Sequence, residues 1–238
     1  FISFSNKMTN FPKNAELVIS RYNEDLHWLD ESLLDPIAKF TIYNKGQNNT
    51  FKMTDKVHNV LRLENMGRES HTYLYHVIRN YDNLADMTIF LPGSMENKFK
   101  WGKLCSVFDM LNLGCNDAFP AAYEQNIYDC YRDFYLNDWS SANEQNNTLN
   151  GQPPLELSEY RPYGEWYKHH FGNECPHHKT GYCGIFAVDR RYILRRPRSF
   201  YEGLITELET SSNPEVGHYY ERAWSAVFSV HGKYPMYI

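Results

Sequence analysis

Short apolar runs and helix-length segments alternate through the first ninety residues, and this alternation constrains the fold most strongly. Four runs have the length and composition of buried strands: "AELVIS" (15–20), "IAKFTIY" (37–43), "VHNVLRL" (57–63) and "DMTIFL" (86–91). Residues 25–34 begin with acidic side chains, and residues 69–81 place apolar side chains on one stripe, as amphipathic helices do. The pattern predicts an α/β sandwich with a mainly parallel central sheet.

The second half of the chain continues the pattern. Residues 96–113, 197–209 and 218–230 are predicted helices, and "GYCGIFAV" (181–188) is a predicted strand. Residues 140–154 are polar and end in two prolines, which predicts a flexible loop. A chain of 238 residues that is 42% hydrophobic can bury one large core, so we expect a single domain over 1–238, with an N-terminal extension at 1–14.

Charge and composition argue against two classes of partner. A net charge of −5 disfavours a nucleic-acid protein that binds by neutralising phosphates. No apolar run reaches the roughly 20 residues that span a bilayer.

Five cysteines, an odd number, do not resemble a disulfide framework, so we expect reduced thiols and a cytoplasmic location. Because the chain begins with Phe rather than Met, a leader or membrane anchor could have been cut from its N-terminus.

A polar cluster, Arg21 to Asp25, directly follows the first predicted strand. In open α/β sheets this loop commonly binds a nucleotide. Asn23 and Glu24 can hydrogen-bond a base or ribose, and Arg21 can bind a carboxylate or phosphate in bidentate fashion. The structural alternative is that Asn23 or Asp25 caps the next helix while Arg21 forms a salt bridge.

Arg68 and Glu69 form a second candidate site, because they follow Gly67 at the predicted start of a helix. Backbone N–H groups and the helix dipole favour an anion at such a position, and Arg68 would add a positive charge. The alternative is an ion pair between Arg68 and neighbouring carboxylates.

A third stretch is rich in metal-ligand side chains. Cys175, His177, His178 and Cys183 include the ligand types that zinc prefers, but no Cys-x-x-Cys pair is present. The stretch is either a structural zinc site or a polar loop beside the active cleft, where His177 or His178 would contact phosphate or acceptor.

Several motifs, read in order, resemble one protein family. "VISRYNEDLHWL", "IYNKG", "NMGRESHTYLYHVIRNYDNLADMTIFLPG", "GIFAVDRRYILRRPRSFYEGLI" and "ERAWSAVF" look like the domain of unknown function 3431 family. The order of signals is also similar to type A glycosyltransferases. That resemblance implies a glycosyltransferase A-like fold with a Rossmann-like nucleotide-binding half. It further implies transfer of a sugar from a UDP- or GDP-linked donor to a glycan or other hydroxyl acceptor.

The chain departs from the type A pattern at one point. These transferases commonly hold a divalent cation with an Asp-x-Asp motif, whereas "TIFLPGSMEN" has no acidic pair. We therefore assign no metal ligands, and Mn or Mg remains an open cofactor. Arginine or lysine would otherwise offset the charge of the departing diphosphate.

Two acidic residues are candidates for the base that takes the acceptor's proton. Asp189 directly follows the strand "GIFAV", and Glu221 opens "ERAWSAVF". Glu221 could instead complement a helix dipole or pair with an arginine. Two other classes of function stay open: a non-catalytic carbohydrate-binding module, which would use the aromatic side chains, and a zinc-stabilised interaction domain.

Overall fold

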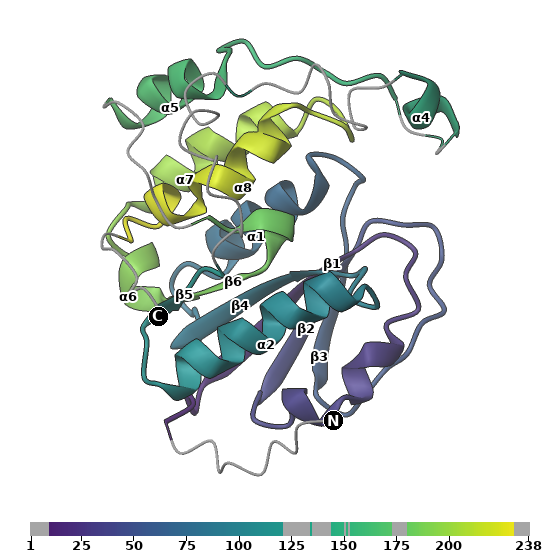
Figure 1. Ribbon diagram of the computed structural model, residues 1–238, viewed down its shortest axis with the longest axis vertical. Helices are drawn as coiled ribbons and strands as arrows, with labels where there is room; N and C mark the ends of the chain where they lie inside the picture. Colours follow the sequence, from purple (N-terminus) through teal and green to yellow (C-terminus); the bar gives the residue numbers. More distant parts are fainter. Residues whose placement is uncertain are drawn as a thin grey trace.

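A six-stranded mixed sheet forms the centre of the protein (Figure 1). The computed structural model describes residues 10–120, 134, 144–149, 151, 153–172 and 180–230. The sheet has the order β3-β2-β1-β4-β6-β5. Its strands are β1 (Ala15–Arg21), β2 (Lys39–Asn44), β3 (Val57–Arg62), β4 (Met87–Pro92), β5 (Asp117–Ala118) and β6 (Phe186–Asp189).

Strand direction divides the sheet into two parts. β1 runs parallel to both β2 and β4, and β2 runs parallel to β3, whereas β6 is antiparallel to β4 and β5. The prediction of an α/β fold with a mostly parallel sheet is confirmed. β1 lies between β2 and β4. The chain that leaves β1 continues to β2 on one side, whereas the chain that leaves β4 continues to β5 and β6 on the other side. The carboxyl ends of β1 and β4 therefore mark a switch point, where open sheets bind ligands.

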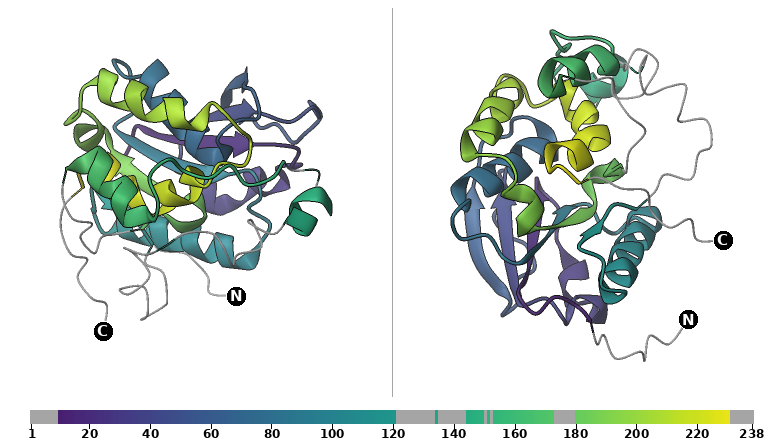
Figure 2. Two further views of the ribbon diagram at one scale, coloured as in Figure 1. Left: turned by 90° about the horizontal axis from the view of Figure 1, so that it is seen from above. Right: turned by 90° about the vertical axis from the view of Figure 1, so that its left-hand side faces the viewer.

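Helices cover both faces of the sheet (Figures 1 and 2). α2 (Lys98–Asn112) covers one face, and α1 (Arg68–Arg79), α7 (Arg198–Ile205) and α8 (Val216–Val227) cover the other. The remaining helical elements are α4 (Glu144–Leu149), α5 (Tyr163–Phe171), α6 (Arg190–Ile193) and the 3-10 turns η1 (His27–Asp30), η2 (Ser32–Leu34), η4 (Tyr182–Gly184) and η5 (Thr206–Leu208). No helix among the described residues has the length and apolar character needed to cross a membrane.

Alternating strand residues supply the two hydrophobic cores. On β1, Leu17 and Ile19 face the α2 side, whereas Val18 faces α1 and α8. Such alternation follows from the two-residue period of a strand and explains why both faces of the central strands are apolar.

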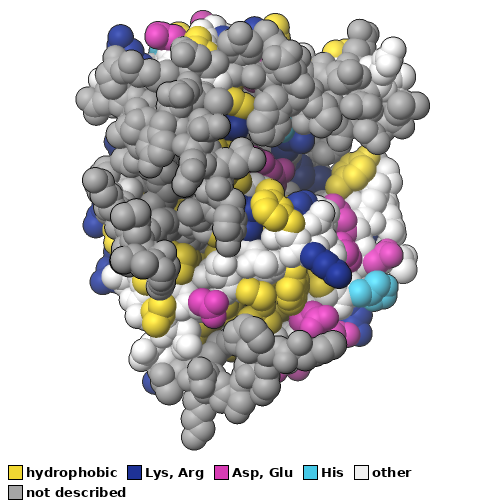
Figure 3. Space-filling view, in the orientation of Figure 1, with side chains coloured by type: hydrophobic (Ala, Val, Ile, Leu, Met, Phe, Trp, Pro, Cys, Tyr) yellow, Lys and Arg dark blue, Asp and Glu magenta, His cyan; other side chains and the backbone are white. Residues whose placement is uncertain are grey.

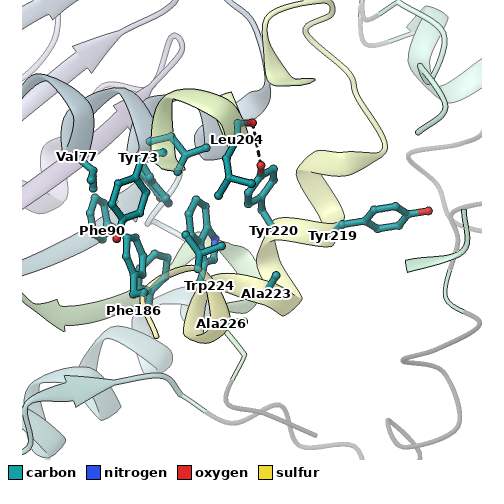
Figure 4. Close-up of a cluster of buried hydrophobic side chains, with 14 of the residues drawn as sticks. Tyr73, Val77, Phe90, Phe186, Leu204, Tyr219, Tyr220, Ala223, Trp224 and Ala226 are labelled. Carbon is teal, nitrogen blue, oxygen red and sulfur yellow. Dashed lines mark hydrogen bonds between the residues drawn. The ribbon is translucent and has the colours of Figure 1, made fainter. Parts of the chain in front are cut away.

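An aromatic cluster joins α8 to the sheet (Figure 4). Phe186 of β6 and Trp224 of α8 stack with their ring centroids 5.3 Å apart, and Tyr73 of α1 lies 5.8 Å from Trp224. Tyr220 also donates a hydrogen bond of 3.0 Å to the carbonyl of Leu204. Tyr219 points away from this cluster (Figure 4). The rings of Tyr219 and Tyr220 both pack on Trp166 of α5, with centroids 5.8 Å and 5.2 Å away. α8 is thus fixed from both sides, which fixes the side chains that it carries.

Two local predictions differ from the structure. Residues 25–34 form the 3-10 turns η1 and η2 rather than an α-helix, and Leu26 before η1 has a left-handed backbone with φ 59°. A left-handed residue at this point prevents a regular helix from continuing through it. Within the predicted loop 140–154, residues Glu144–Leu149 form α4. The rest of that segment is only partly described, and residues 1–9 of the predicted extension lie outside the described residues.

Candidate functional site

A cavity of about 470 Å³ lies at the switch point of the sheet, at the carboxyl ends of β1 and β4. In Figure 3, acidic and basic side chains line a hollow in the upper half of the face in view. The lining residues come from both halves of the chain: Ser20, Arg21, Tyr22, Glu24, Lys45, Asn65, Arg68, Glu69, Pro92, Ser94, Lys100, Gly151, Cys183, Ser212 and Glu221.

Arg21 connects the loops that follow β1 and β2. Its side chain is fully buried, its Nε donates to the carbonyl of Glu24 (2.7 Å), and its Nη1 donates to Asn44 Oδ1 (2.7 Å) and the Asn48 carbonyl (2.6 Å). The guanidinium also lies 4.1 Å from the centroid of the Phe51 ring. These contacts make Arg21 a residue that holds the wall of the cavity together, whereas binding of an anion by Arg21 stays a prediction.

Glu24 and Asn23 close the loop after β1. The Oε2 atom of Glu24 accepts hydrogen bonds from the backbone N–H groups of Tyr22 (2.7 Å) and Asn23 (3.1 Å). Asn23 Oδ1 accepts from the N–H of Asn48 (3.1 Å), and Asn23 does not line the cavity. A Cβ atom at Gly93 would lie 2.6 Å from Glu24 Oε2, so a larger residue there would displace the Glu24 carboxylate. The structure therefore places Glu24 against the cavity and Asn23 behind it.

The start of α1 has an unusual backbone. Gly67 and Arg68 are both left-handed, with φ 58° and 51°. Lys45 Nζ donates to the carbonyls of Met66 and Arg68, the latter at 2.5 Å, and so ties the end of β2 to this turn. Burial lowers the pKa of Lys45 to about 7, although the charge of Glu69 opposes that change. Left-handed backbone at a non-glycine residue is found mainly where surrounding contacts enforce it, as they do here.

Arg68 reaches across the cavity toward the segment before α8. Its Nη2 donates to Asn213 Oδ1 at 2.5 Å. Among the described residues it forms no ion pair, so the alternative of a salt bridge to neighbouring carboxylates is not what the structure shows. Lys100 in the first turn of α2 donates to Ser94 Oγ at 2.6 Å. With Arg21, the side chains of Lys45, Arg68 and Lys100 thus bring four basic groups from separate parts of the chain to one cavity.

Glu221 is the carboxyl group in the cavity whose pKa is most perturbed. Burial, and next the negative charge of Glu69, raise its pKa to about 7. The charges of Arg222 and Arg68 and the backbone N–H of Cys183 oppose this rise. A carboxyl group with a pKa near neutrality can both accept and release a proton at physiological pH, which is typical of acid–base groups at functional sites.

The structure brings Arg21, Glu24, Arg68, Glu69 and Glu221 together, but it does not bring Asp189 to them. β6 is antiparallel to β4, so Asp189 at its carboxyl end pairs with Met87 at the beginning of β4, at the opposite edge of the sheet. There it accepts from the N–H of Arg191 (2.7 Å), caps α6 and forms an ion pair with the Arg191 side chain (2.7 Å). The expectation that Asp189 is a candidate base beside Glu221 is therefore wrong, because the direction of β6 was not readable from the sequence.

The predicted Cys/His stretch is only partly described. Cys175, His177 and His178 lie outside the described residues, whereas Cys183 lines the cavity. In the described part of the chain, no group of three or more His, Cys, Asp or Glu side chains is placed to hold a metal ion. The zinc interpretation therefore stays a prediction.

Sequence reasoning missed Lys45 and Lys100. Lys45 directly follows the second strand in "IYNKG", which is the same position relative to β2 that the polar cluster has relative to β1. Because parallel strands end at one edge, this position was a usable signal. Lys100 carried no such signal, since one lysine in the first turn of an amphipathic helix is common on protein surfaces.

No curated protein matches the chain. The model of a family described as "Protein of unknown function (DUF3431)" matches residues 17–235, which is nearly the whole chain. The protein therefore belongs to the DUF3431 family.

Proposed function

We propose that this protein is a glycosyltransferase that moves a sugar from a UDP- or GDP-linked donor to a hydroxyl group of a glycan or similar acceptor. The observation that carries the proposal is one cavity at the switch point of the sheet. It combines the cationic side chains of Arg68 and Lys100 with a carboxyl group, Glu221, whose pKa is near 7. A nucleotide sugar needs the first feature for its diphosphate, and an attacking hydroxyl needs the second.

The cations would act on the leaving group. As the bond between the anomeric carbon and the diphosphate oxygen breaks, its electron pair stays on the diphosphate, where negative charge develops. Arg68 and Lys100 are placed in the cavity wall by Asn213 and Ser94, and preorganised charges of this kind stabilise such a transition state. Side chains of this protein can thus do what a divalent cation does in other transferases.

Glu221 would act on the acceptor. In an inverting transfer, the acceptor oxygen forms its bond to the anomeric carbon while its proton moves to the Glu221 carboxylate. The aromatic contacts that fix α8 hold this carboxylate in place. Glu24 and Glu69 line the same cavity and are the remaining candidates for contacts to the donor, whereas Arg21 and Asn23 position the loop after β1.

The experiment is a screen of nucleotide sugars for binding and turnover. Thermal shift detects donors, because a ligand that binds only the folded state stabilises it by mass action. Release of nucleoside diphosphate in the presence of glycan acceptors then measures transfer. We expect turnover to persist in the presence of a chelator and to fall about 100-fold or more in Arg68→Ala, the scale on which charge-stabilising groups act. Arg79→Ala, at the exposed end of α1, is the matched control.

One outcome would contradict the proposal, and another would contradict only the role given to Arg68 and Lys100. Stabilisation by free glycans but by no nucleotide or nucleotide sugar would indicate a carbohydrate-binding module. Turnover that a chelator abolishes and Mn restores would still support a transferase, but it would reject the role proposed for Arg68 and Lys100.

A further inference from the structure

We propose that Lys45 is an anion ligand of the cavity and that it takes up a proton when the diphosphate of a ligand binds. This inference rests on the proposed function for the identity of the anion, but it concerns a residue and a regulation that the transfer chemistry does not itself require. It predicts that the protein binds its donor more tightly at slightly acidic pH than at alkaline pH.

Lys45 lies where an anion in the cavity would contact it. Lys45 follows β2 at the sheet edge where the cavity lies, and only 5% of its surface is exposed. It lines the main cavity and also a neighbouring one of about 340 Å³, with which the main cavity shares Asn65 as well. A ligand in either space therefore meets the Lys45 side chain.

The hydrogen bonds of the Lys45 amine suit both of its protonation states. Nζ donates to two carbonyl oxygens, those of Met66 and Arg68. A neutral amine has two N–H donors and one lone pair, so it satisfies both carbonyls and directs the lone pair elsewhere. An ammonium keeps the same two bonds and has a third N–H for a ligand. The left-handed turn at Gly67 and Arg68 thus accommodates both protonation states without rearrangement.

Few charged groups compensate the burial of the Lys45 amine. Among the described residues, Lys45 forms no ion pair, so its burial is compensated by carbonyl dipoles and by the more distant charge of Glu69. His71, behind it on α1, is kept neutral at pH 7, since burial and the charge of Lys45 lower the pKa of His71 to about 4. The other charged groups that line the two cavities beside Lys45 are Arg21, Glu24, Arg62, Glu64, Arg68, Glu69, Lys100 and Glu221.

An anion changes this balance directly. A diphosphate beside Nζ favours the ammonium, because an opposite charge within a few ångströms stabilises the charged form of an amine. The pKa of Lys45, lowered to about 7 by burial, then rises, so binding above pH 7 is accompanied by proton uptake. By linkage, the protonated protein binds the anion more tightly by the same factor.

The experiment measures the protonation of Lys45 itself. Protein with ¹³C-labelled lysine is titrated by NMR from pH 5.5 to 10, free and saturated with inorganic pyrophosphate. Lys45→Met identifies the signal, and Lys45→Arg serves the same purpose if the methionine variant does not fold. We expect a midpoint near pH 7 that rises by about one unit or more with pyrophosphate, which corresponds to about tenfold tighter binding to the charged form. The exposed Lys13 is the internal control and should not move.

The outcomes separate this inference from the proposed function. A Lys45 midpoint that pyrophosphate leaves unchanged, with binding detected at other signals, overturns the role of Lys45 and leaves the transferase standing. Absence of binding by pyrophosphate and by every nucleoside diphosphate overturns both. Lys45→Arg, which stays charged throughout, should bind pyrophosphate with a smaller pH dependence between pH 6 and pH 8.5 than the unchanged protein, because only the ionisation of Glu221 and of pyrophosphate itself then contributes. A pH dependence equal to that of the unchanged protein would also reject the inference.

Discussion

Glu221 is held in surroundings that favour its neutral form. Its folded pKa of about 7 exceeds the unfolded value of 4.5, so the folded state binds the proton more strongly. Folding therefore gains stability from this group at low pH and loses that gain as the pH rises from 4.5 through 7. Above pH 7 Glu221 is a charged carboxylate in surroundings that favour the neutral form, and this destabilises the fold. The same carboxylate is then free to accept a proton.

Replacement of Glu221 by Gln should separate activity from stability. We expect turnover to fall by roughly 100-fold or more, the usual effect of losing a general base. The free energy of unfolding at pH 8 should rise by up to about 3 kcal/mol, because the amide carries no charge to bury. Denaturant unfolding at pH 8 and at pH 5 measures the second effect, which should shrink at the lower pH.

Glu202→Gln is the matched control, since Glu202 is exposed on α7 and should change neither quantity. Near-normal turnover of Glu221→Gln on an accepted substrate would remove the base from this position. Asp189 could not replace it, because that carboxylate lies at the opposite edge of the sheet.

The turn before α1 controls two cationic residues of the cavity. Gly67 is left-handed, and a Cβ atom there would lie 2.5 Å from the carbonyl oxygen of Leu208 and 2.6 Å from its Cβ. Both the backbone conformation and the space therefore require glycine. Any shift of this turn also moves the carbonyl groups that hold Lys45.

We expect Gly67→Ala to destabilise the protein by about 2–4 kcal/mol, as strained backbone and overpacking act together. Gly203→Ala is the control: nothing lies within 4 Å of a Cβ atom there, inside α7, so it should stabilise by roughly 0.5–1 kcal/mol. Urea midpoints of the two variants measure both changes. Equal midpoints for Gly67→Ala and the unchanged protein would show that the turn adapts.

The sequence predicted regular elements better than irregular ones. β1 and β4 were readable because apolar runs such as 15–20 and 86–91 are bounded by polar residues, and the stripe on α1 was readable from its period. The segment 25–34 was misread because the left-handed conformation of Leu26 depends on packing against the rest of the molecule. The direction of β6 was also hidden, and with it the true place of Asp189.

Three buried histidines make the stability of the whole molecule depend on pH. Burial, as the largest cause, lowers the pKa of His71 and His76 to about 4 and that of His218 to about 3. Their unfolded value is 6.5, so the unfolded chain binds protons first as the pH falls. Their contribution to stability is therefore present above pH 6.5 and is lost as the pH falls toward 4.

We expect the free energy of unfolding to fall by on the order of 5 kcal/mol between pH 7 and pH 4, although Glu221 acts in the opposite direction over part of this range. Guanidinium unfolding at half-unit steps of pH measures the slope. His76→Gln should flatten it, whereas the exposed His58→Gln should leave it unchanged. A stability that stays constant from pH 7 to pH 4 would show that the three histidines are already accessible to protons.

The residues that line the cavity run from Ser20 to Glu221, although the parallel strands that carry it are complete by Pro92. During synthesis on the ribosome, β1 to β4 emerge early and can pair with one another, since domains fold as their chain appears. Glu221 and its neighbours on α8 emerge only after the whole sheet. A chain interrupted before α8 would have all six strands and all the basic side chains that line the cavity, but no carboxylate from that helix, so the proposed activity requires a chain that extends through α8.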